Sequence, residues 1–140
     1  MRSTGYDEDM TDQETPSNEL VTSVFARACM SRAALEDVST KWSSLALLAL
    51  GEGDFRFNAL RRKVEGVSEK MLSQTLQTLE RDGMVTREVH STIPPRVEYS
   101  LTALGTVVAE NLRSLADLLE ASALEIGTSR ATYDEARSTT

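Results

Sequence analysis

Apolar residues recur at helical spacing in four stretches before residue 83, and each stretch predicts a helix. The first face, with a further turn or helix after it, is made of Leu20, Val24, Phe25, Ala28, Ala33, Ala34 and Val38. The second helix begins at Ser39 or Thr40, either of which can cap it, and ends at Gly51. A short third helix runs from Phe57 to Val64, just after a brief strand-like alternation.

The fourth helix has the clearest pattern. Ser68 can cap its beginning, and the Asp-Gly pair at 82–83 ends it. Its core-facing stripe consists of Leu72, Leu76 and Leu79. Since only residues 65–67 separate it from the third helix, the two form a predicted helix-turn-helix.

Two alternating, β-rich stretches follow at residues 84–89 and 96–101. They flank residues 90–95, whose Pro94-Pro95 pair gives a rigid hairpin tip. Thr102 then caps a long final helix. The predicted fold is therefore mainly α with a small β-hairpin, an α+β winged helix-turn-helix.

The apolar stripe of the final helix is wider than one small domain needs, because Val107 and Leu118 broaden it. Such a stripe favours packing on a second copy, although part of it must pack on its own core. We therefore expect a homodimer through the terminal helices. The residues expected at its interface are Val24, Val108, Leu112, Leu115 and Leu119.

Polar and acidic residues gather at the two ends of the chain. Residues 1–19 hold one arginine and six acidic residues, so they are predicted to be a disordered acidic arm. Residues 127–140 are predicted to be a flexible tail, which leaves 20–126 as the DNA-binding and dimerisation domain. The net charge is −7, but residues 56–100 hold eight basic and six acidic residues, which permits a local basic face.

The sequence lacks the residues that several classes of protein need. No apolar run reaches the ~18 residues of a membrane span, and the polar N-terminus does not resemble a secretory signal. A cytoplasmic, nucleoid-associated protein is expected. One cysteine (Cys29) and one histidine (His90) leave no ordinary zinc site, and we expect no metal and no cofactor. A thiol enzyme would rest on these two side chains alone, so no enzymatic activity is expected.

The outward face of the fourth helix carries polar side chains suited to base edges in the major groove. Its residues are Lys70, Ser73, Gln74 and Gln77, with Thr75 at the edge. The residues expected at phosphates are Lys41, Arg56, Ser68, Lys70 and Arg96, of which Arg96 can instead enter the minor groove. Open alternatives are a merely solvated helix face, an Arg96 pair with Glu88, and Arg61 or Arg62 either solvated or paired with Glu65.

Three stretches of the chain together resemble the HxlR family of winged helix-turn-helix regulators, within the MarR-like superfamily. They are Cys29 with Trp42 in "TKW", then "FRFNALRRKVEGVSEKMLSQTLQTLERDGMVTRE", then "PPRVEYSLTALG". They span residues 29–105, over half of the chain. The chain departs from the usual family pattern at Cys29-Met30, at Ser39-Thr40 and at Thr75, where the family often has Cys-Pro, Gly-Gly and an arginine.

The resemblance implies a homodimer that binds double-stranded DNA at a palindromic operator and acts as a transcriptional regulator, with a repressor expected. It also implies, for some members, sensing of oxidants or electrophiles at the position of Cys29. Arg27 and Arg32 are close enough in sequence to stabilise a thiolate there. A buried cysteine that acts as a small hydrophobe is the alternative. Two further alternatives stay open: a winged-helix protein-interaction module, and a regulator with a small-molecule effector at the dimer interface.

Overall fold

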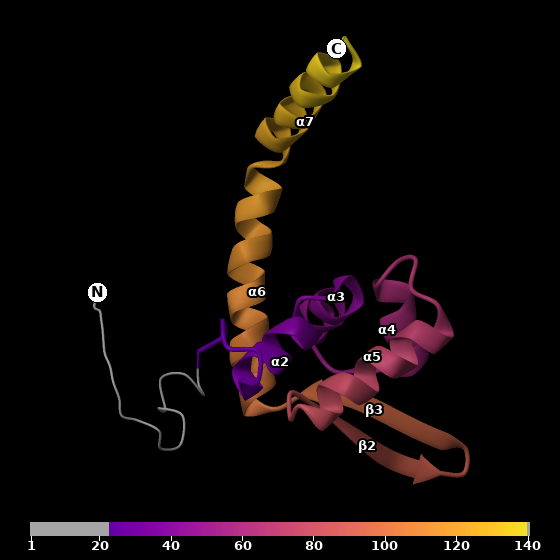
Figure 1. Cartoon of the computed structure of the whole chain (residues 1–140). Coiled ribbons are helices and arrows are strands. Elements are labelled where there is room, and N and C mark those ends of the chain that lie inside the picture. Colours follow the sequence, from indigo (N-terminus) through magenta and orange to yellow (C-terminus); the bar gives the residue numbers. More distant parts are fainter. Residues whose placement is uncertain (1–22, 140) are drawn as a thin grey trace, which may run out of the picture. The chain divides into compact units, whose positions relative to one another are not determined.

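The computed structural model describes residues 23–139 (Figure 1). The chain divides into two units, Met1–Thr40 and Lys41–Thr140, and the first is described from residue 23 onward. The predicted acidic arm, residues 1–19, lies outside the described residues. The single domain predicted over 20–126 stays a prediction.

The described part of the first unit contains one helix, α2 (Met30–Val38), which begins directly after Cys29. The helix predicted from Leu20 to Ala28 is wrong where the structure describes it, because residues 24–28 form turns and a bend. The amides of Ala26 and Cys29 bond to carbonyls three residues back, which closes turns rather than a continuing α-helix. Phe25 is 89% exposed, so burial gives no compensation for ordering a helix there.

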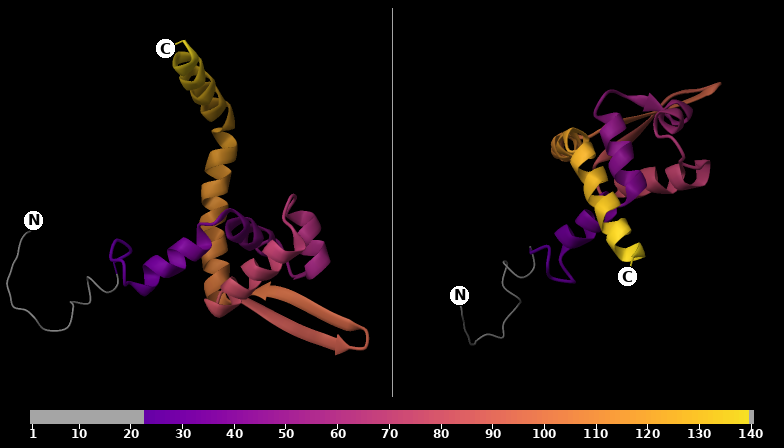
Figure 2. Two further views of the ribbon diagram at one scale, coloured as in Figure 1. Left: turned by 45° about the vertical axis from the view of Figure 1, so that its right-hand side comes forward. Right: turned by 90° about the horizontal axis from the view of Figure 1, so that it is seen from above.

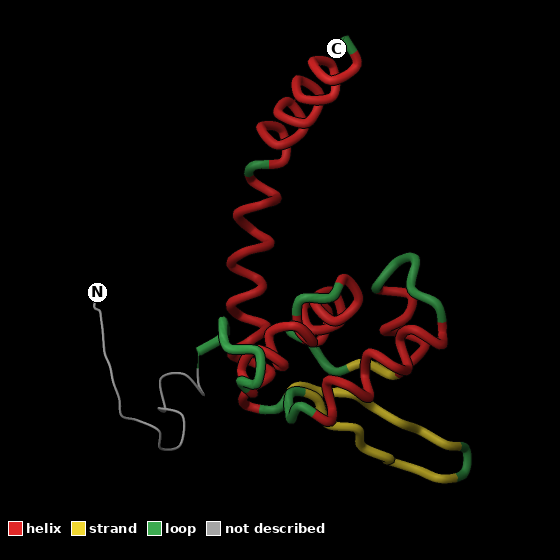
Figure 3. The backbone as a smooth tube through the Cα atoms, in the orientation of Figure 1, coloured by secondary structure: helices red, strands yellow, loops and turns green. Residues whose placement is uncertain are grey.

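The second unit contains the predicted helix-turn-helix. Its elements are α3 (Lys41–Leu50), β1 (Phe55–Arg56), α4 (Phe57–Lys63), α5 (Glu69–Arg81), β2 (Val85–Thr92), β3 (Pro95–Leu101), α6 (Ala103–Ala121) and α7 (Ala123–Ser138). The three strands form an antiparallel sheet in the order β1-β3-β2 (Figure 3). The mainly α winged helix-turn-helix predicted from the sequence is therefore confirmed.

The core of this unit lies where α3 packs against α4 and α5 and where all three helices pack against the sheet. Its fully buried side chains come from all of these elements: Leu47, Leu60, Leu72, Leu76, Leu79 and Val85. The predicted leucine stripe of α5 thus faces the core, which turns the other side of that helix outward.

The hairpin of β2 and β3, called the wing below, is longer than predicted. Pairing continues to Ser91 opposite Arg96 and Thr92 opposite Pro95, after a register shift that follows Val89. The tip is therefore Ile93-Pro94, with a cis peptide bond, and His90 belongs to β2. In Figure 2 the wing projects from the helices of its unit.

The base of α6 is fixed at the junction between α5 and β2. The Thr102 amide donates to the Met84 carbonyl at 3.0 Å, and the Thr102 hydroxyl donates to the Gly83 carbonyl at 2.7 Å. The same hydroxyl oxygen accepts from the Gly105 amide at 3.0 Å, which confirms Thr102 as the predicted cap. A Cβ at Gly105 would collide with the Met84 carbonyl oxygen, so this close approach requires glycine.

The chain stays helical beyond residue 126, where the sequence analysis predicts a flexible tail. Helix α7 follows α6 after a single non-helical residue, Ser122. It is rich in alanine, glutamate and arginine, all good helix formers, and Gly127 reduces its stability by only about 1 kcal/mol. None of its described residues is buried. Whether this helix moves relative to α6 stays a prediction. No helix within residues 23–139 is long and apolar enough to cross a lipid bilayer.

Candidate nucleic-acid interface

Helix α5 presents a polar face on the side opposite its buried leucines. The Ser68 hydroxyl oxygen accepts from the Met71 amide at 3.1 Å, so the predicted cap is confirmed and the first turn is fixed. The side chains of Lys70, Gln74 and Gln77 are exposed and Ser73 is half-buried. We call these four residues the reading face.

Thr75 does not belong to that face, contrary to the sequence-based placement at its edge. Its side chain is only 7% exposed. It lies three residues after Leu72 and four before Leu79, and this spacing puts it on the buried side of the helix. The signal was present in the sequence, but the polarity of threonine favoured the wrong side. We leave Thr75 out of the proposed base contacts.

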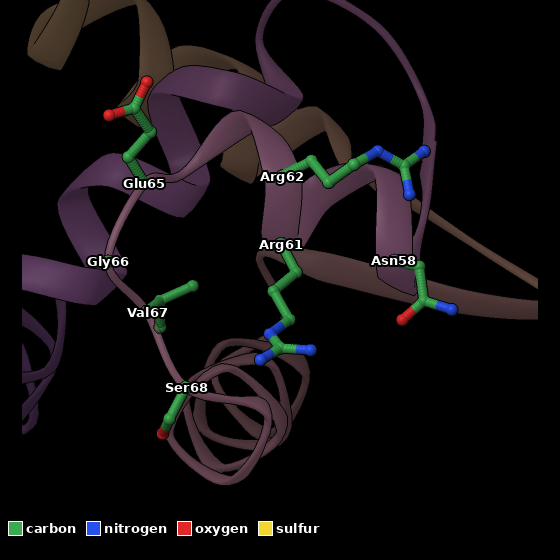
Figure 4. A pocket seen from close by; sticks show the side chains of 7 residues that line it. All are labelled: Asn58, Arg61, Arg62, Glu65, Gly66, Val67 and Ser68. Carbon is green, nitrogen blue, oxygen red and sulfur yellow. The ribbon is translucent and has the colours of Figure 1, made fainter.

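A hollow of about 710 Å³ lies at the turn between α4 and α5 (Figure 4). Its lining residues are Asn58, Arg61, Arg62, Glu65, Gly66, Val67 and Ser68. Figure 4 shows the Arg61 guanidinium directed towards the beginning of α5, whereas the Glu65 carboxylate points to the other side of the turn. No ion pair joins Glu65 to Arg61 or Arg62 within residues 23–139, so the interpretation of these arginines as solvated is favoured.

A second hollow, of about 450 Å³, lies between α4 and the wing. Its lining residues are Arg56, Phe57, Asn58, Ala59, Arg62, Pro95, Arg96 and Val97. The structure thus brings together Arg56 and Arg96, which the sequence analysis proposed for phosphate contacts independently. It also adds Arg62, whose role the sequence alone leaves open. We call this concavity the arginine hollow.

A third hollow, of about 400 Å³, separates α5 from the wing. Ser73 and Gln77 of the reading face line it, together with Arg87 of β2. The sequence analysis missed Arg87 as a candidate. Its position opposite Tyr99 in the hairpin register places it beside α5, and that register depends on tertiary pairing rather than on local sequence.

The wing register contradicts the suggested pair between Arg96 and Glu88. Arg96 lies opposite Ser91, whereas Glu88 lies opposite Glu98. Both glutamates are close to His90, whose Nε2 is 2.9 Å from Glu98 Oε1 and 3.6 Å from Glu88 Oε1. His90 therefore has a local role between two carboxylates, and Arg96 stays available to an outside partner.

Lys41 is the first residue of α3, and its ammonium lies over the ring of Trp42, 4.4 Å from the ring centroid. The far edge of that ring lies 3.5 Å from the position of a Cβ on Gly66, in the turn before α5. The lysine is thus held near the helix-turn-helix by a cation–π contact. Its predicted phosphate contact stays a prediction.

Cys29 is 2% exposed and immediately precedes α2. Burial raises the pKa of its thiol, but hydrogen bonds from the Ser31 hydroxyl and from the backbone amides of Arg32 and Ser31 outweigh it, so the pKa lies below the ordinary value. The Cys29 Sγ to Ser31 Oγ distance is 2.7 Å. The Arg32 guanidinium is bonded to Glu36 and the Phe25 carbonyl, so the predicted thiolate stabilisation comes from its backbone instead.

Helix α6 has two apolar sides. Ala109 is buried where the helix packs on α3, Gly105 is buried against Met84, and Val108 and Leu112 are half-buried. The other side is exposed and consists of Leu104, Val107, Leu115, Leu118 and Leu119. Of the residues predicted at a dimer interface, Val24, Leu115 and Leu119 are exposed in the single chain, and their place in an interface stays a prediction.

Comparisons with known proteins agree with this architecture. The family model for HxlR-like helix-turn-helix proteins matches residues 37–125, which include the whole helix-turn-helix and the wing. The HTH-type transcriptional regulator YtfH of Escherichia coli K12 is 50% identical over 103 residues, which cover 74% of this chain and 82% of that protein.

Solved structures show the same fold. The transcriptional regulator YtfH from Salmonella typhimurium superposes with a TM-score of 0.73 at 46% identity, over 78% of this chain and 97% of that one. The redox regulator HypR in its oxidized form gives a TM-score of 0.61 at 33% identity, over 66% of this chain and 96% of that one. From its fold, its polar reading face and these matches, the chain belongs to the HxlR-like helix-turn-helix family and is a DNA-binding transcriptional regulator.

Proposed function

We propose that this protein is a repressor without enzymatic activity that binds a palindromic operator as a homodimer and responds to thiol oxidants. The observation that carries the proposal is the reading face of α5, which is exposed between two concavities lined by arginines. Such a helix enters the major groove, and the basic groups beside it contact phosphates.

The reading face has the chemistry that base recognition needs. Gln74 and Gln77 can each make paired hydrogen bonds to adenine, and Ser73 can bond to several bases. Lys70 lies in the first turn of α5, where it can contact phosphate or guanine. The surrounding arginines supply affinity that does not depend on sequence, so specificity in this proposal comes from the two glutamines.

The exposed apolar side of α6 supports the proposed dimer. A contiguous row of leucine and valine is costly to leave in water, and a second copy of the same helix can cover it. Two-fold symmetry would place the two reading helices about one DNA turn, roughly 34 Å, apart on a palindrome. Occupation of such a site by a protein of this size is expected to exclude other proteins from it, hence repression.

The oxidant response rests on Cys29. Its hydrogen bonds favour the thiolate, which is the form that oxidants attack. A similar fold belongs to HypR, a redox regulator solved in oxidized and reduced forms. Oxidation of a single thiol gives a sulfenic acid or a mixed disulfide, or a bridge between subunits if the two thiols lie close enough.

The proposal is tested by fluorescence anisotropy with a labelled duplex from upstream of the protein's own gene and with a scrambled duplex. Wild type should bind the first more tightly, and affinity should fall steeply with salt. Gln74→Ala and Gln77→Ala should abolish the preference, whereas Arg130→Gln on the exposed surface of α7 should not change it. Equal affinity for every sequence, including sequences selected from a random library, would favour a protein-interaction module instead.

The redox part has its own readout in the same assay. A thiol oxidant should weaken binding by wild type and leave Cys29→Ser unaffected. If the Cys29→Ser variant responds to the oxidant as wild type does, Cys29 is a core residue and the proposed switch is wrong.

A further inference from the structure

We propose that Arg56, Arg62 and Arg96 together hold one backbone phosphate of the DNA in the arginine hollow. The three residues come from β1, α4 and β3, so the fold gathers them from separate parts of the second unit. The inference rests on the proposed function and names the DNA group that this site takes. It assigns Arg62 a role and places Arg96 on the backbone rather than in the minor groove.

The hollow has the charge of an anion site. Three guanidinium groups line its walls, and no acidic side chain is among its lining residues. Within residues 23–139, none of the three arginines forms an ion pair, although Lys63, Arg32 and Arg113 do. Like charges gathered in one concavity repel one another, and a bound anion removes that repulsion. Guanidinium groups also match phosphate oxygens in geometry.

The acidic side chain opposite Arg56, that of Glu98, is bonded to a residue outside the hollow. Glu98 lies directly opposite Arg56 in the pairing of β1 with β3, so the two side chains point to the same face of the sheet. Its carboxylate nevertheless bonds to His90 at 2.9 Å rather than to Arg56. The other carboxylate close to His90 is that of Glu88, which lies on β2, the strand that does not pair with β1. Arg56 therefore keeps its charge available to the hollow.

The surroundings favour a nucleic-acid phosphate over a free anion. Asn58 and Arg62 line both the arginine hollow and the hollow at the α4–α5 turn, so the two concavities adjoin along one side of α4. Together they run from the wing to the beginning of the reading helix, which is the course that a DNA backbone strand would follow. Phe57, Ala59 and Val97 add apolar walls that fit a deoxyribose.

The test is a scan with duplexes in which one phosphate at a time is replaced by a neutral methylphosphonate. Wild type should lose roughly tenfold in affinity at one position in each half-site, as expected for a charge-assisted contact. Arg56→Gln, Arg62→Gln and Arg96→Gln should each lower affinity and each lose sensitivity at that same position. Because the three arginines share one phosphate, the slope of log affinity against log salt should fall by no more than about 1 in each variant.

Arg61→Gln is the matched control, because Arg61 is on the same helix but lines only the turn hollow. It should lose sensitivity at a different phosphate. Thermal melting of each variant checks that these exposed substitutions leave the fold intact. Separate phosphates for the three arginines would overturn the shared site.

The two proposals fail in different ways. Phosphate contacts carry no sequence information, so each of the three arginine variants should also bind a scrambled duplex more weakly and with a smaller salt slope. These losses without any sequence preference would contradict the proposed function alone. Sequence preference without the common loss of sensitivity at one phosphate would contradict the shared phosphate alone.

Discussion

At the scale of single residues, one thiol determines the chemistry of the first unit and one glycine determines how closely α6 can pack in the second. Cys29 is a buried thiol whose ionisation is favoured by the Ser31 hydroxyl and by two amides at the beginning of α2. Gly105 allows a helix to approach a carbonyl that any other residue would strike. Neither effect needs a long-range charge, and each can be removed by one substitution.

The Ser31 hydrogen bond predicts the pH dependence of Cys29 alkylation. Because it stabilises the thiolate, the midpoint of the iodoacetamide rate against pH should lie below that of a free cysteine, near 8.5. Ser31→Ala removes this bond, so the pKa rises and the midpoint moves to higher pH. Cys29→Ser gives the unlabelled background. A midpoint in Ser31→Ala at or below that of wild type would contradict the assignment.

A pair of glycine substitutions should change stability in opposite directions. Gly105→Ala forces its methyl group against the Met84 carbonyl and should destabilise the protein by about 1–3 kcal/mol. Gly127→Ala has open space around it in α7 and should stabilise the helix by up to about 1 kcal/mol. Urea unfolding followed by circular dichroism measures both. Unchanged or increased stability in Gly105→Ala would mean that the close approach at Gly105 does not constrain α6.

At the scale of elements, the sequence predicted best where capping and apolar spacing agree. Helix α5 has a serine cap, an i, i+4, i+7 leucine stripe and a glycine after its end, and the structure confirms all three. The helix expected before Ala28 is wrong because Phe25 finds no burial, whereas α7 is helical beyond residue 126 without any buried residue among those described. The arginine hollow could not be predicted at all, since it joins residues about 40 positions apart through sheet pairing.

The cap of α5 can be separated from its reading face by two serine substitutions. Ser68→Ala removes the bond to the Met71 amide and should cost about 1 kcal/mol of stability. Ser73→Ala lies within the same helix, where alanine is the better helix former, and should leave stability within about 0.5 kcal/mol of wild type. Thermal melting distinguishes them. If both variants melt like wild type, water replaces the cap without loss.

At the scale of the whole molecule, α6 links the core of one chain to a second copy in the proposed dimer. Leu115 is 51% exposed and Leu118 is 61% exposed in the single chain, so neither is needed to fill its core. Substitution of either leucine should therefore change the dissociation constant of the dimer and leave the free energy of unfolding of the protomer unchanged. The dimer can thus be tested without unfolding the protomer.

Leu115→Lys should weaken the dimer strongly. Loss of one buried leucine from each copy costs roughly 3–6 kcal/mol, which corresponds to a rise in the dissociation constant of at least about a hundredfold. Val89→Lys is the matched control, because Val89 is also 51% exposed but lies on the wing. Sedimentation velocity over a concentration series measures the change. Equal dissociation constants for the two variants would place the interface elsewhere.

The anchoring of Thr102 determines which operators such a dimer can use. One residue separates the end of the wing from the beginning of α6, and it is bonded at both its amide and its hydroxyl to the α5–β2 junction. No flexible linker lies between the surface that would hold the partner and the helix that would contact bases. Tolerance to half-site spacing should therefore be narrow, so insertion of a single base pair at the centre of a palindrome would be rejected, whereas a repressor with tethered DNA-binding domains would adapt to it.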